Sequence, residues 1–498
     1  MPRDLRVLAF DLGSSGGRAV VGRYDGGRIE LEVVHRFANG PIRLHGSHYW
    51  DVLRLYQEVR AGLARAAGQP GELSSLGFST WGVDYALLDD TGRLLSQVYS
   101  YRDDRTEGLY DQVFQKIPMG ALYDQTGIMF IRFNTVVQLY ADRVRQPWLL
   151  DSARAMLMMP DLFAYFLTGR MTSEITIAST TQMFSPRTFS WVPEIPARLG
   201  IPERILQPII RPGEMVGTVL PETAEACGCP ASLPVIAVGE HDTASAIAAA
   251  PIEDPQACAF VSAGTWSLLG MELDGPITGD ASLRGNFTNE VGVGDKIAFH
   301  KIIAGMWLIQ NCRKEWEREG LFLSYAEIND AAAGAEPFRF FFDPDDPRFM
   351  NPPVMTQAIA ACLRERGLAA PESHAQVARG IYESLALNYR YEIDAMEKIT
   401  GRRVRTINIV GGGSRSPLLC QLTADTTGRP VVAGPDEATS MGNVLSQLAA
   451  KGEIRTLAEG RDVVRRSVSM VTYHPRDEYR WQEAYGVFRE LKKRREEE

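Results

Sequence analysis

The sequence is poor in the residues and runs that mark several common classes of protein. Its 498 residues include only six cysteines, and Cys227 and Cys229 form a single C-x-C pair with no second pair to complete a zinc site. We therefore expect reduced thiols and no disulfide framework. No apolar run approaches the roughly 18 residues of a membrane span. The apolar run before Asp11 has four residues, too short for a signal peptide. A cytoplasmic soluble protein is the expectation.

An excess of positive charge is also missing. The formal net charge is -9, which argues against nucleic acid or an anionic membrane as the main partner. Hydrophobic residues make up 45% of the chain and charged residues 23%, as in ordinary globular proteins. A chain of 498 residues is too long for one hydrophobic core, so we expect two large domains.

The common phosphate-binding fingerprints are absent as well. The motif G-x-x-x-x-G-K-[ST] does not occur, and the first glycine-rich loop, 13–17, lies between two predicted strands, Arg6–Phe10 and Ala19–Tyr24. The Walker and Rossmann loops are excluded here because both need a helix next. A tight turn with small side chains can still hold phosphate through backbone N–H groups. A plain hairpin turn is the alternative.

The same arrangement of strand, small-residue turn and strand returns at 257–272, which predicts a diverged structural repeat. A further glycine-rich loop, 411–417, lies between a predicted strand, Thr406–Val410, and a predicted helix, Leu418–Thr426. That is the usual position for the base or phosphate of a nucleotide. The sequence from Ile195 to Leu233 is rich in proline and glycine and is predicted to be irregular.

Asp242 lies at a predicted turn between a strand, Val235–Val238, and a helix of small residues, Ala244–Ala250. One interpretation is a helix N-cap, since a carboxylate that accepts backbone N–H bonds there is common. The other is a general base, because an aspartate is ionised at neutral pH and can accept a proton from a substrate hydroxyl. Two other polar residues that open helical segments, Asn134 and Asp161, are interpreted as caps.

The C-terminal tail is predicted to be a helix with Trp481, Tyr485 and Phe488 on one face. Its last residues, Lys492–Glu498, are a run of charge. We interpret that run as a solvated helix end.

Six motifs in order resemble the FGGY carbohydrate kinases, a family within the actin, Hsp70 and sugar kinase superfamily. The motifs are Asp11–Ser15, Thr80–Asp84, Tyr101–Thr106, Gly239–Thr243, Ser262–Ser267 and Gly411–Gly413. The resemblance runs from about Val7 to about Ala450. A further set is similar to the branch of this family that acts on L-rhamnulose: Thr80–Asp84, Phe133–Thr135, His241–Ala246 and Asp346–Pro352.

This resemblance implies an α/β fold of two ribonuclease-H-like (actin-like ATPase) domains with a cleft between them. The implied boundaries are an N-terminal sugar-binding domain at 1–248, a C-terminal nucleotide-binding domain at 249–456 and a C-terminal helical extension at 457–498.

The implied activity is phosphorylation of L-rhamnulose by ATP at the C1 hydroxyl, with Mg²⁺, to give L-rhamnulose 1-phosphate and ADP in L-rhamnose catabolism. The implied partners are the ketose and ATP, with neither nucleic acid nor membrane. Asp242 would accept the proton and Asp11 would orient the magnesium shell. The residues implied to bind sugar are Gly82, His241, Asp242 and Thr243, and those implied to bind ATP are Ser14, Ser15, Gly16, Gly17, Arg18, Thr265, Gln310 and Gly412.

One position departs from the family pattern. Relatives carry a sugar-contacting Asn just after the lysine that corresponds to Lys301, and this chain has Ile302. An isoleucine side chain cannot donate or accept a hydrogen bond. A kinase for a related ketose, L-fuculose or a pentulose, is therefore an alternative. The alternative from another class is an ATPase switch like actin or Hsp70, which no sugar would stimulate.

Overall fold

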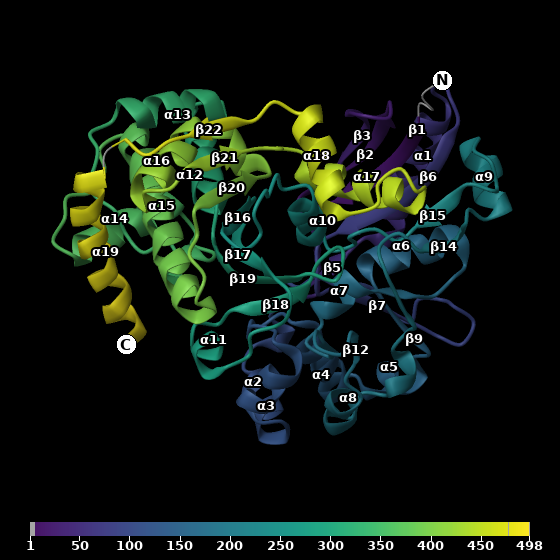
Figure 1. The fold of residues 1–498 in the computed structure, drawn as a ribbon. Coiled ribbons are helices and arrows are strands. Elements are labelled where there is room, and N and C mark those ends of the chain that lie inside the picture. Colours follow the sequence, from purple (N-terminus) through teal and green to yellow (C-terminus); the bar gives the residue numbers. More distant parts are fainter. Residues whose placement is uncertain (1–4, 477, 498) are drawn as a thin grey trace. The chain divides into compact units, whose positions relative to one another are not determined.

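The computed structural model describes residues 5–476 and 478–497, which form two compact units (Figure 1). Unit 1 contains the chain up to Ala249 together with Glu272–Phe299 and Ala438–Ser467. Unit 2 contains Ala250–Met271, His300–Glu437 and the chain from Val468 onward. Each unit is thus assembled from segments far apart in the sequence, whereas the boundaries proposed from the sequence were continuous ranges.

Unit 1 is built on a six-stranded sheet with the strand order β14-β15-β6-β1-β2-β3. Its strands are β1 Leu5–Leu12, β2 Gly16–Tyr24, β3 Ile29–Ala38, β6 Leu73–Thr80, β14 Met215–Thr218 and β15 Pro234–Ile236. Strand β1 pairs antiparallel with β2 and parallel with β6, and Phe10 stacks on Phe78 across the β1–β6 pair with ring centroids 4.9 Å apart. The central strand is buried on both faces, which explains its nearly continuous apolar sequence.

The smaller strands of unit 1 form short ribbons. They are β4 Ile42–Leu44, β5 Ser47–Trp50, β7 Tyr85–Leu88, β8 Val98–Tyr99, β9 Ala155–Met158, β10 Ser173–Glu174, β11 Phe184–Ser185, β12 Ser190–Trp191 and β13 Ile209–Ile210. Strand β18, Thr288–Val291, also lies in unit 1 but in none of these ribbons. The helices of unit 1 are α1 Val52–Ala67, α2 Leu109–Lys116, α3 Met119–Thr126, α4 Thr135–Arg145, α5 Pro147–Ser152, α6 Met159–Thr168, α7 Ile175–Ser179, α8 Glu194–Leu199, α9 Pro221–Cys227, α10 Asp242–Ala248, α11 Asp280–Arg284, α17 Ala438–Ala450 and α18 Leu457–Ser467.

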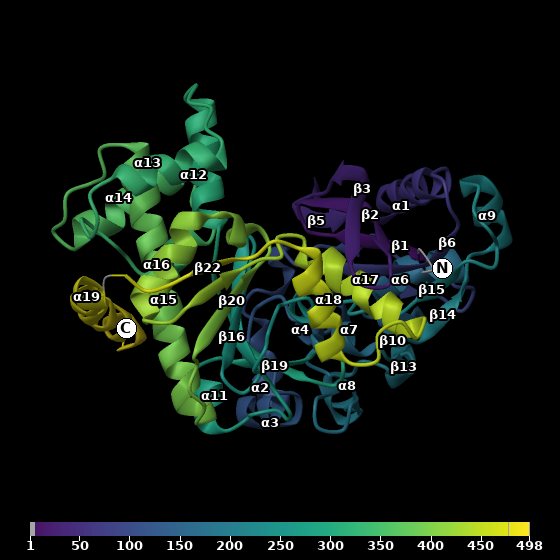
Figure 2. The ribbon, with the colours of Figure 1, turned by 45° about the horizontal axis from the view of Figure 1, so that its top comes forward.

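Helix α17 packs against strands of unit 1 that lie more than 350 residues before it, β1 and β6 (Figure 2). Close packing is possible because its residues are small. A Cβ atom on Gly442 would lie 1.8 Å from the carbonyl oxygen of Ser245, so the backbones of α17 and α10 are in contact. Within the helix, Gln447 donates to the backbone oxygen of Leu8 at 3.0 Å. These contacts fix α10, and with it Asp242, against the sheet.

Unit 2 repeats the topology of unit 1. Its strands lie in the order β19-β17-β16-β20-β21-β22, and β16 pairs antiparallel with β17 and parallel with β20, as β1 does with β2 and β6. The strands are β16 Cys258–Ala263, β17 Trp266–Leu273, β19 Ile297–Ala304, β20 Thr406–Val410, β21 Val431–Ala433 and β22 Val471–Tyr473. The helices are α12 Trp307–Arg318, α13 Tyr325–Gly334, α14 Met355–Glu365, α15 His374–Thr400, α16 Pro417–Thr427 and α19 Glu478–Glu497, with a 3-10 turn, η4, at Gly412–Arg415.

Most elements expected from the sequence are present. The first glycine-rich loop joins two antiparallel strands, the second copy of that arrangement is found at β16–β17, and the loop 411–417 lies between β20 and α16. The prediction for Ile195–Leu233 was wrong, because this segment contains two short helices, α8 and α9, and two short strands, β13 and β14. The six cysteines are all present as thiols. Among the described residues, no helix combines the length and the apolar character needed to cross a membrane.

Candidate active site

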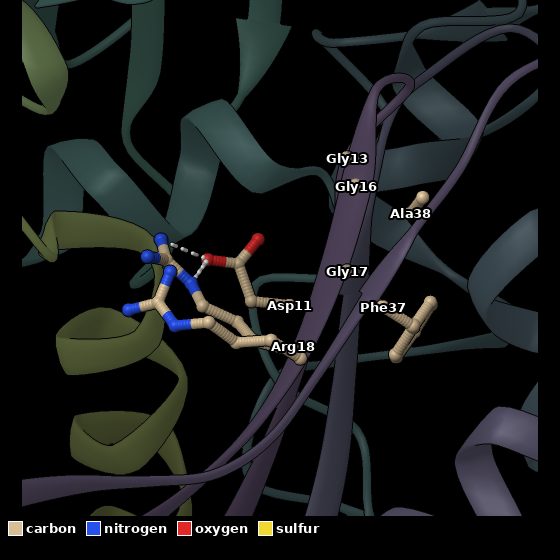
Figure 3. A pocket seen from close by; sticks show the side chains of 8 residues that line it. Asp11, Gly13, Gly16, Gly17, Arg18, Phe37 and Ala38 are labelled. Atoms are coloured by element: carbon tan, nitrogen blue, oxygen red, sulfur yellow. Dashed lines mark hydrogen bonds and ion pairs between the residues drawn. The ribbon is translucent and has the colours of Figure 1, made fainter.

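The turn between β1 and β2 forms one wall of a pocket of about 460 Å³ (Figure 3). The pocket is lined by Asp11, Gly13, Gly16, Gly17, Arg18, Arg36, Phe37 and Ala38. A Cβ atom on Gly17 would lie 2.3 Å from the ring of Phe37, so only glycine allows this ring to cover the hairpin. The turn itself is closed by a hydrogen bond of 2.9 Å from Gly13 N to Gly16 O. Ser14 and Ser15 lie at its tip, where Ser15 is exposed to solvent.

Asp11 and Arg18 face each other across the hairpin on the side opposite Phe37 (Figure 3). The guanidinium donates to one carboxylate oxygen, Oδ2, from Nε at 2.9 Å and from Nη2 at 2.7 Å. The hydroxyl of Ser440, in α17, also donates to this oxygen at 3.3 Å. No hydrogen bond from the described residues reaches the other oxygen, Oδ1. The arrangement joins a fixed cation to a carboxylate that keeps one oxygen for a further ligand.

Asp242 is the first residue of α10, and His241 occupies the N-cap position without a side-chain cap hydrogen bond. The structure therefore does not support the interpretation of Asp242 as the N-cap of α10. The Asp242 side chain is 33% exposed. Burial and the nearby Asp11 carboxylate raise its pKa, although His241 pulls the pKa the other way. A carboxylate with a raised pKa is a stronger base than a free aspartate.

Helix α17 holds Asp242 near the glycine-rich hairpin. Thr439 donates from its hydroxyl to the backbone oxygen of Asp242 at 3.4 Å, and the next residue, Ser440, donates to Asp11. The predicted base and the predicted phosphate loop therefore lie at the same end of one helix in unit 1.

The other residues predicted to bind sugar gather around His241. A Cβ atom on Gly82 would lie 3.4 Å from Nε2 of His241 and 3.5 Å from the Thr180 hydroxyl, so the backbone at Gly82 runs beside the imidazole. Thr243 donates from its hydroxyl to Asp242 Oδ1 at 3.3 Å. The structure thus brings Gly82, His241, Asp242 and Thr243 together.

The charge on His241 is set by the acids around it. Its Nδ1 lies 3.0 Å from a carboxylate oxygen of Glu290, and its Nε2 lies 3.5 Å from Asp242 Oδ1. Burial opposes a positive charge on the imidazole, but these two carboxylates outweigh it and raise the pKa of His241. A protonated His241 can donate a hydrogen bond to a bound hydroxyl from its Nε2–H, the ring nitrogen that lies beside Gly82.

A single buried carboxylate organises the turn that carries Gly82. Asp84 is 1% exposed and accepts hydrogen bonds from the indoles of Trp50 and Trp81, at 2.6 and 2.9 Å, and from the amide of Gln138 at 3.1 Å. Burial raises the pKa of Asp84 to about 6, and these donors hold it from rising further. Asp84 therefore fixes the two tryptophans beside Gly82.

Three further acids are buried beneath the turn that carries His241. Asp161, Glu174 and Glu240 are each at most 2% exposed. Glu174 Oε2 accepts hydrogen bonds from the Thr176 hydroxyl at 2.5 Å and from Glu240 N at 3.3 Å, and the Thr176 oxygen accepts from His241 N at 3.1 Å. Asp161 was predicted to cap α6, which was wrong: Met158 is at the N-cap position, and Asp161 Oδ1 accepts from Glu174 N at 3.0 Å.

Burial raises the pKa of each of these three acids, and for Glu174 it raises the pKa to about 7. Glu240 is raised further by the facing carboxylates of Asp161 and Glu174. The cluster therefore favours the protonated forms. Its contribution to stability is complete below the unfolded pKa of about 4.3 and is lost as the pH rises through the folded pKa.

Glu174→Gln is expected to make the melting temperature fall less between pH 5 and pH 8 than it does in the wild type. Glutamine keeps an oxygen for Thr176 and for the backbone, but it has no proton to lose. The groups that face position 174 are Asp161, Glu240 and His241. Scanning fluorimetry across this pH range measures the difference, with the exposed Glu253→Gln as the matched control. Parallel curves for the wild type and Glu174→Gln would show that Glu174 does not titrate in this window.

The predicted nucleotide residues of unit 2 meet at one end of its sheet. Thr265 lies in the turn between β16 and β17, Gly412 begins η4 after β20, and Gln310 lies in the first turn of α12. The backbone joins them: Trp307 N donates to Thr265 O at 3.0 Å, and a Cβ atom on Gly413 would lie 2.4 Å from the Cβ of Ala263. The geometry is a set of turns whose small residues leave the backbone accessible to a ligand.

Sequence reasoning missed several residues of this site. Ser440 and Thr439 begin a helix of small residues that carries no motif, and Glu290 carries no local signal. Glu174 and Glu240 were missed, and Asp161 was interpreted as a cap, because the sequence gives no sign that these acids are buried and buried carboxylates are rare. These residues lie far apart in the sequence, so the sequence does not show that they are close together in the fold.

Comparison with known proteins identifies relatives over nearly the whole chain. The model of the FGGY family of carbohydrate kinases, N-terminal domain, matches residues 6–248, and the C-terminal domain of the same family matches residues 259–451. A rhamnulokinase of Bacteroides thetaiotaomicron is 41% identical over 482 residues, covering 97% of this chain and 98% of the relative. A rhamnulokinase of Bacillus subtilis is 37% identical over 470 residues, covering 94% and 95%.

Solved structures with the same fold include kinases of other small molecules. Gluconate kinase from Lactobacillus acidophilus superposes with a TM-score of 0.80 at 15% identity, covering 99% of this chain and 98% of its own. Glycerol kinase from Plasmodium falciparum with ADP gives 0.78 at 16% identity, with the coverage again 99% and 98%. At these identities the likeness establishes the fold, which is the mixed α/β fold of two related units expected from the sequence.

Proposed function

Because this chain belongs to the FGGY family of carbohydrate kinases, we propose that it phosphorylates L-rhamnulose at the C1 hydroxyl with ATP. The products are L-rhamnulose 1-phosphate and ADP, in L-rhamnose catabolism. The observation that carries the choice of sugar is the identity of 37 to 41% over nearly full length to relatives named rhamnulokinase. Residues 1–248 are proposed to bind the sugar and residues 249–456 the nucleotide, with residues 457–498 as a helical extension.

Asp242 is proposed as the group that accepts the hydroxyl proton. Its carboxylate is partly exposed, has no capping role and has a raised pKa. Its neighbours His241, Thr243 and the backbone at Gly82 supply hydrogen-bonding groups for the other oxygens of the ketose. Proton acceptance of this kind contributes about 10²–10⁴-fold to a rate.

The phosphates are proposed to lie against two turns. In unit 1 the turn of Ser14, Ser15, Gly16 and Gly17 presents backbone N–H groups beside the Arg18 guanidinium, and in unit 2 Thr265, Gln310 and Gly412 hold the rest of the nucleotide. Phosphoryl transfer needs mainly positioning and charge stabilisation, which backbone donors and a fixed cation provide.

Magnesium is proposed to accompany ATP. Within the described ranges, no group of three or more His, Cys, Asp or Glu side chains is arranged to hold a metal ion. Asp11 Oδ1, which the described residues leave without a hydrogen bond, fits a cation bound mainly by water and phosphate oxygens, the usual state of Mg²⁺. When bound there, Mg²⁺ would neutralise charge on the phosphates.

The sugar panel is the experiment that tests this proposal. ADP release is measured with L-rhamnulose, L-fuculose, L-ribulose and D-xylulose at equal concentrations. L-Rhamnulose is expected to give the highest kcat/KM, by about tenfold or more, the discrimination that one or two well-placed hydrogen bonds provide. Preference for another ketose would refute the substrate. ADP release that no ketose stimulates would refute the kinase reaction and favour an ATPase switch.

A further inference from the structure

The C-terminal helix α19 is not a solvated appendage of unit 2. Trp481, Tyr485 and Phe488 are at most 5% exposed, and the helix packs against α15 and α16 (Figure 2). The charged run at its end was predicted to be solvated, and for Lys492 that was wrong, because its side chain is only 3% exposed. The neighbouring Lys493 is 51% exposed and pairs with Glu490 within the helix, as the prediction expected.

The buried ammonium of Lys492 is surrounded by carboxylates. Its Nζ lies 3.0 Å from Asp343, 2.9 Å from Asp345 and 3.8 Å from Glu392. Burial alone would lower the pKa of Lys492, but these carboxylates outweigh burial and raise it. Losing the ammonium would leave the partly buried Asp345 without its cation beside other acids, which is costly.

Asp345 connects this cluster to the backbone at the end of β19. Its Oδ2 accepts from Lys492 and from the Asn388 amide at 2.8 Å, while its Oδ1 accepts from Ala304 N at 2.7 Å. Burial favours the neutral form of Asp345, but Lys492 and the Ala304 N–H hold its pKa below the usual value. The carboxylate therefore depends on Lys492 to remain charged in this position.

The backbone that follows Ala304 packs against the turn that carries Thr265, part of the predicted nucleotide site. A Cβ atom on Gly305 would lie 2.6 Å from the carbonyl carbon of Trp266, so the two chain segments are in direct contact. Met306 N donates to Gly264 O and Trp307 N donates to Thr265 O, both at 3.0 Å. The same segment then begins α12, which carries Gln310.

We propose that Lys492 is a positioning residue for nucleotide binding. Its ammonium holds Asp345, Asp345 holds the backbone at Ala304, and that backbone holds the turn of Thr265 and the start of α12. The C-terminal helix thereby sets the geometry of the predicted nucleotide site of unit 2 from a position that does not touch the ligand. This inference rests on the proposed assignment of Thr265 and Gln310 to ATP.

The test compares Lys492→Met with Lys493→Met, adjacent lysines on the same helix. Affinity for MgADP, in the absence of sugar, is measured by isothermal titration calorimetry at a temperature well below the melting temperature of each variant. Lys492→Met is expected to weaken MgADP binding by about 5–10-fold, the scale of one typical hydrogen bond, because the lost contact acts on the ligand only through the backbone. Lys493→Met is expected to remain within about twofold of the wild type because it loses only an exposed ion pair. Lys492→Arg, which keeps the charge, should recover most of the affinity.

A folded Lys492→Met protein with wild-type affinity for MgADP would overturn the proposal, as would equal losses in both lysine variants. If Lys492→Met does not fold, Asp345→Asn decides the question: it keeps an oxygen for Ala304 N but not the charge that pairs with Lys492, and unchanged affinity would overturn the proposal. A purely structural role would lower the melting temperature without changing the affinity at low temperature. Failure of the wild type to bind MgADP would instead refute the assignment of the nucleotide site.

Discussion

Asp242→Asn is expected to lower kcat for ketose phosphorylation by about 10²–10⁴-fold while the affinity for MgADP stays within about twofold of the wild type. Asparagine has nearly the shape of aspartate but cannot accept the hydroxyl proton. The partly exposed carboxylate and its raised pKa are the features that make it the base. Steady-state kinetics by coupled ADP release, together with calorimetric titration of MgADP, separates the chemical step from nucleotide binding.

The matched control is Asp254→Asn, an aspartate to asparagine change at an exposed position in a loop. It should leave both kcat and MgADP affinity unchanged. Asp242→Glu retains a carboxylate but moves it by one methylene, and an intermediate loss of rate is expected. Full activity of Asp242→Asn would remove this side chain from the mechanism.

Gly442→Ala is expected to destabilise the fold. The new Cβ would lie 1.8 Å from Ser245 O and 2.6 Å from the carbonyl carbon of the same residue, both backbone atoms that cannot rotate away. Helices α10 and α17 must therefore separate. Overpacking in a core costs about 1–3 kcal/mol and occasionally more, which in a chain of 498 residues corresponds to a fall in melting temperature of about 1–3 °C for that range.

Activity should fall together with stability in Gly442→Ala, because α17 carries Thr439 and Ser440, which contact Asp242 and Asp11. The control is Gly120→Ala, also within a helix, where nothing lies within 4 Å of the added Cβ. Alanine is the better helix former there, so the melting temperature should stay the same or rise slightly. Equal melting temperatures for the wild type and Gly442→Ala would mean that the two helices are not packed as described.

The elements of the fold were largely predictable from local sequence, and their assembly was not. The buried strand β1 shows as an apolar run, and the turn at Gly13–Gly17 shows as small residues between two such runs. The membership of α17 in unit 1 could not be predicted, because it depends on the contact between Gly442 and Ser245. A lone glycine in a helix gives no sign of which backbone it approaches.

The residues of the candidate site also fall into a group that could be predicted from local sequence and a group that could not. Residues that lie in motifs, such as Asp242, Gly82 and Ser14, were proposed from the order of the motifs. The residues that hold them in place were not, because their side chains break the usual relation between charge and exposure. Glu174 and Lys492 are charged residue types that are buried only because distant segments supply their partners. Partners that come from distant segments are seen only in the tertiary structure.

The central claim is that the Asp242 carboxylate receives the proton of the ketose hydroxyl that is phosphorylated. A crystal structure with L-rhamnulose and a non-hydrolysable ATP analogue tests it most directly. We expect an Asp242 carboxylate oxygen to lie within hydrogen-bonding reach of the C1 hydroxyl oxygen, at about 2.6–3.2 Å, on the side away from the terminal phosphate. A carboxylate that makes no contact with this hydroxyl, while sugar and nucleotide are both bound, would contradict the account.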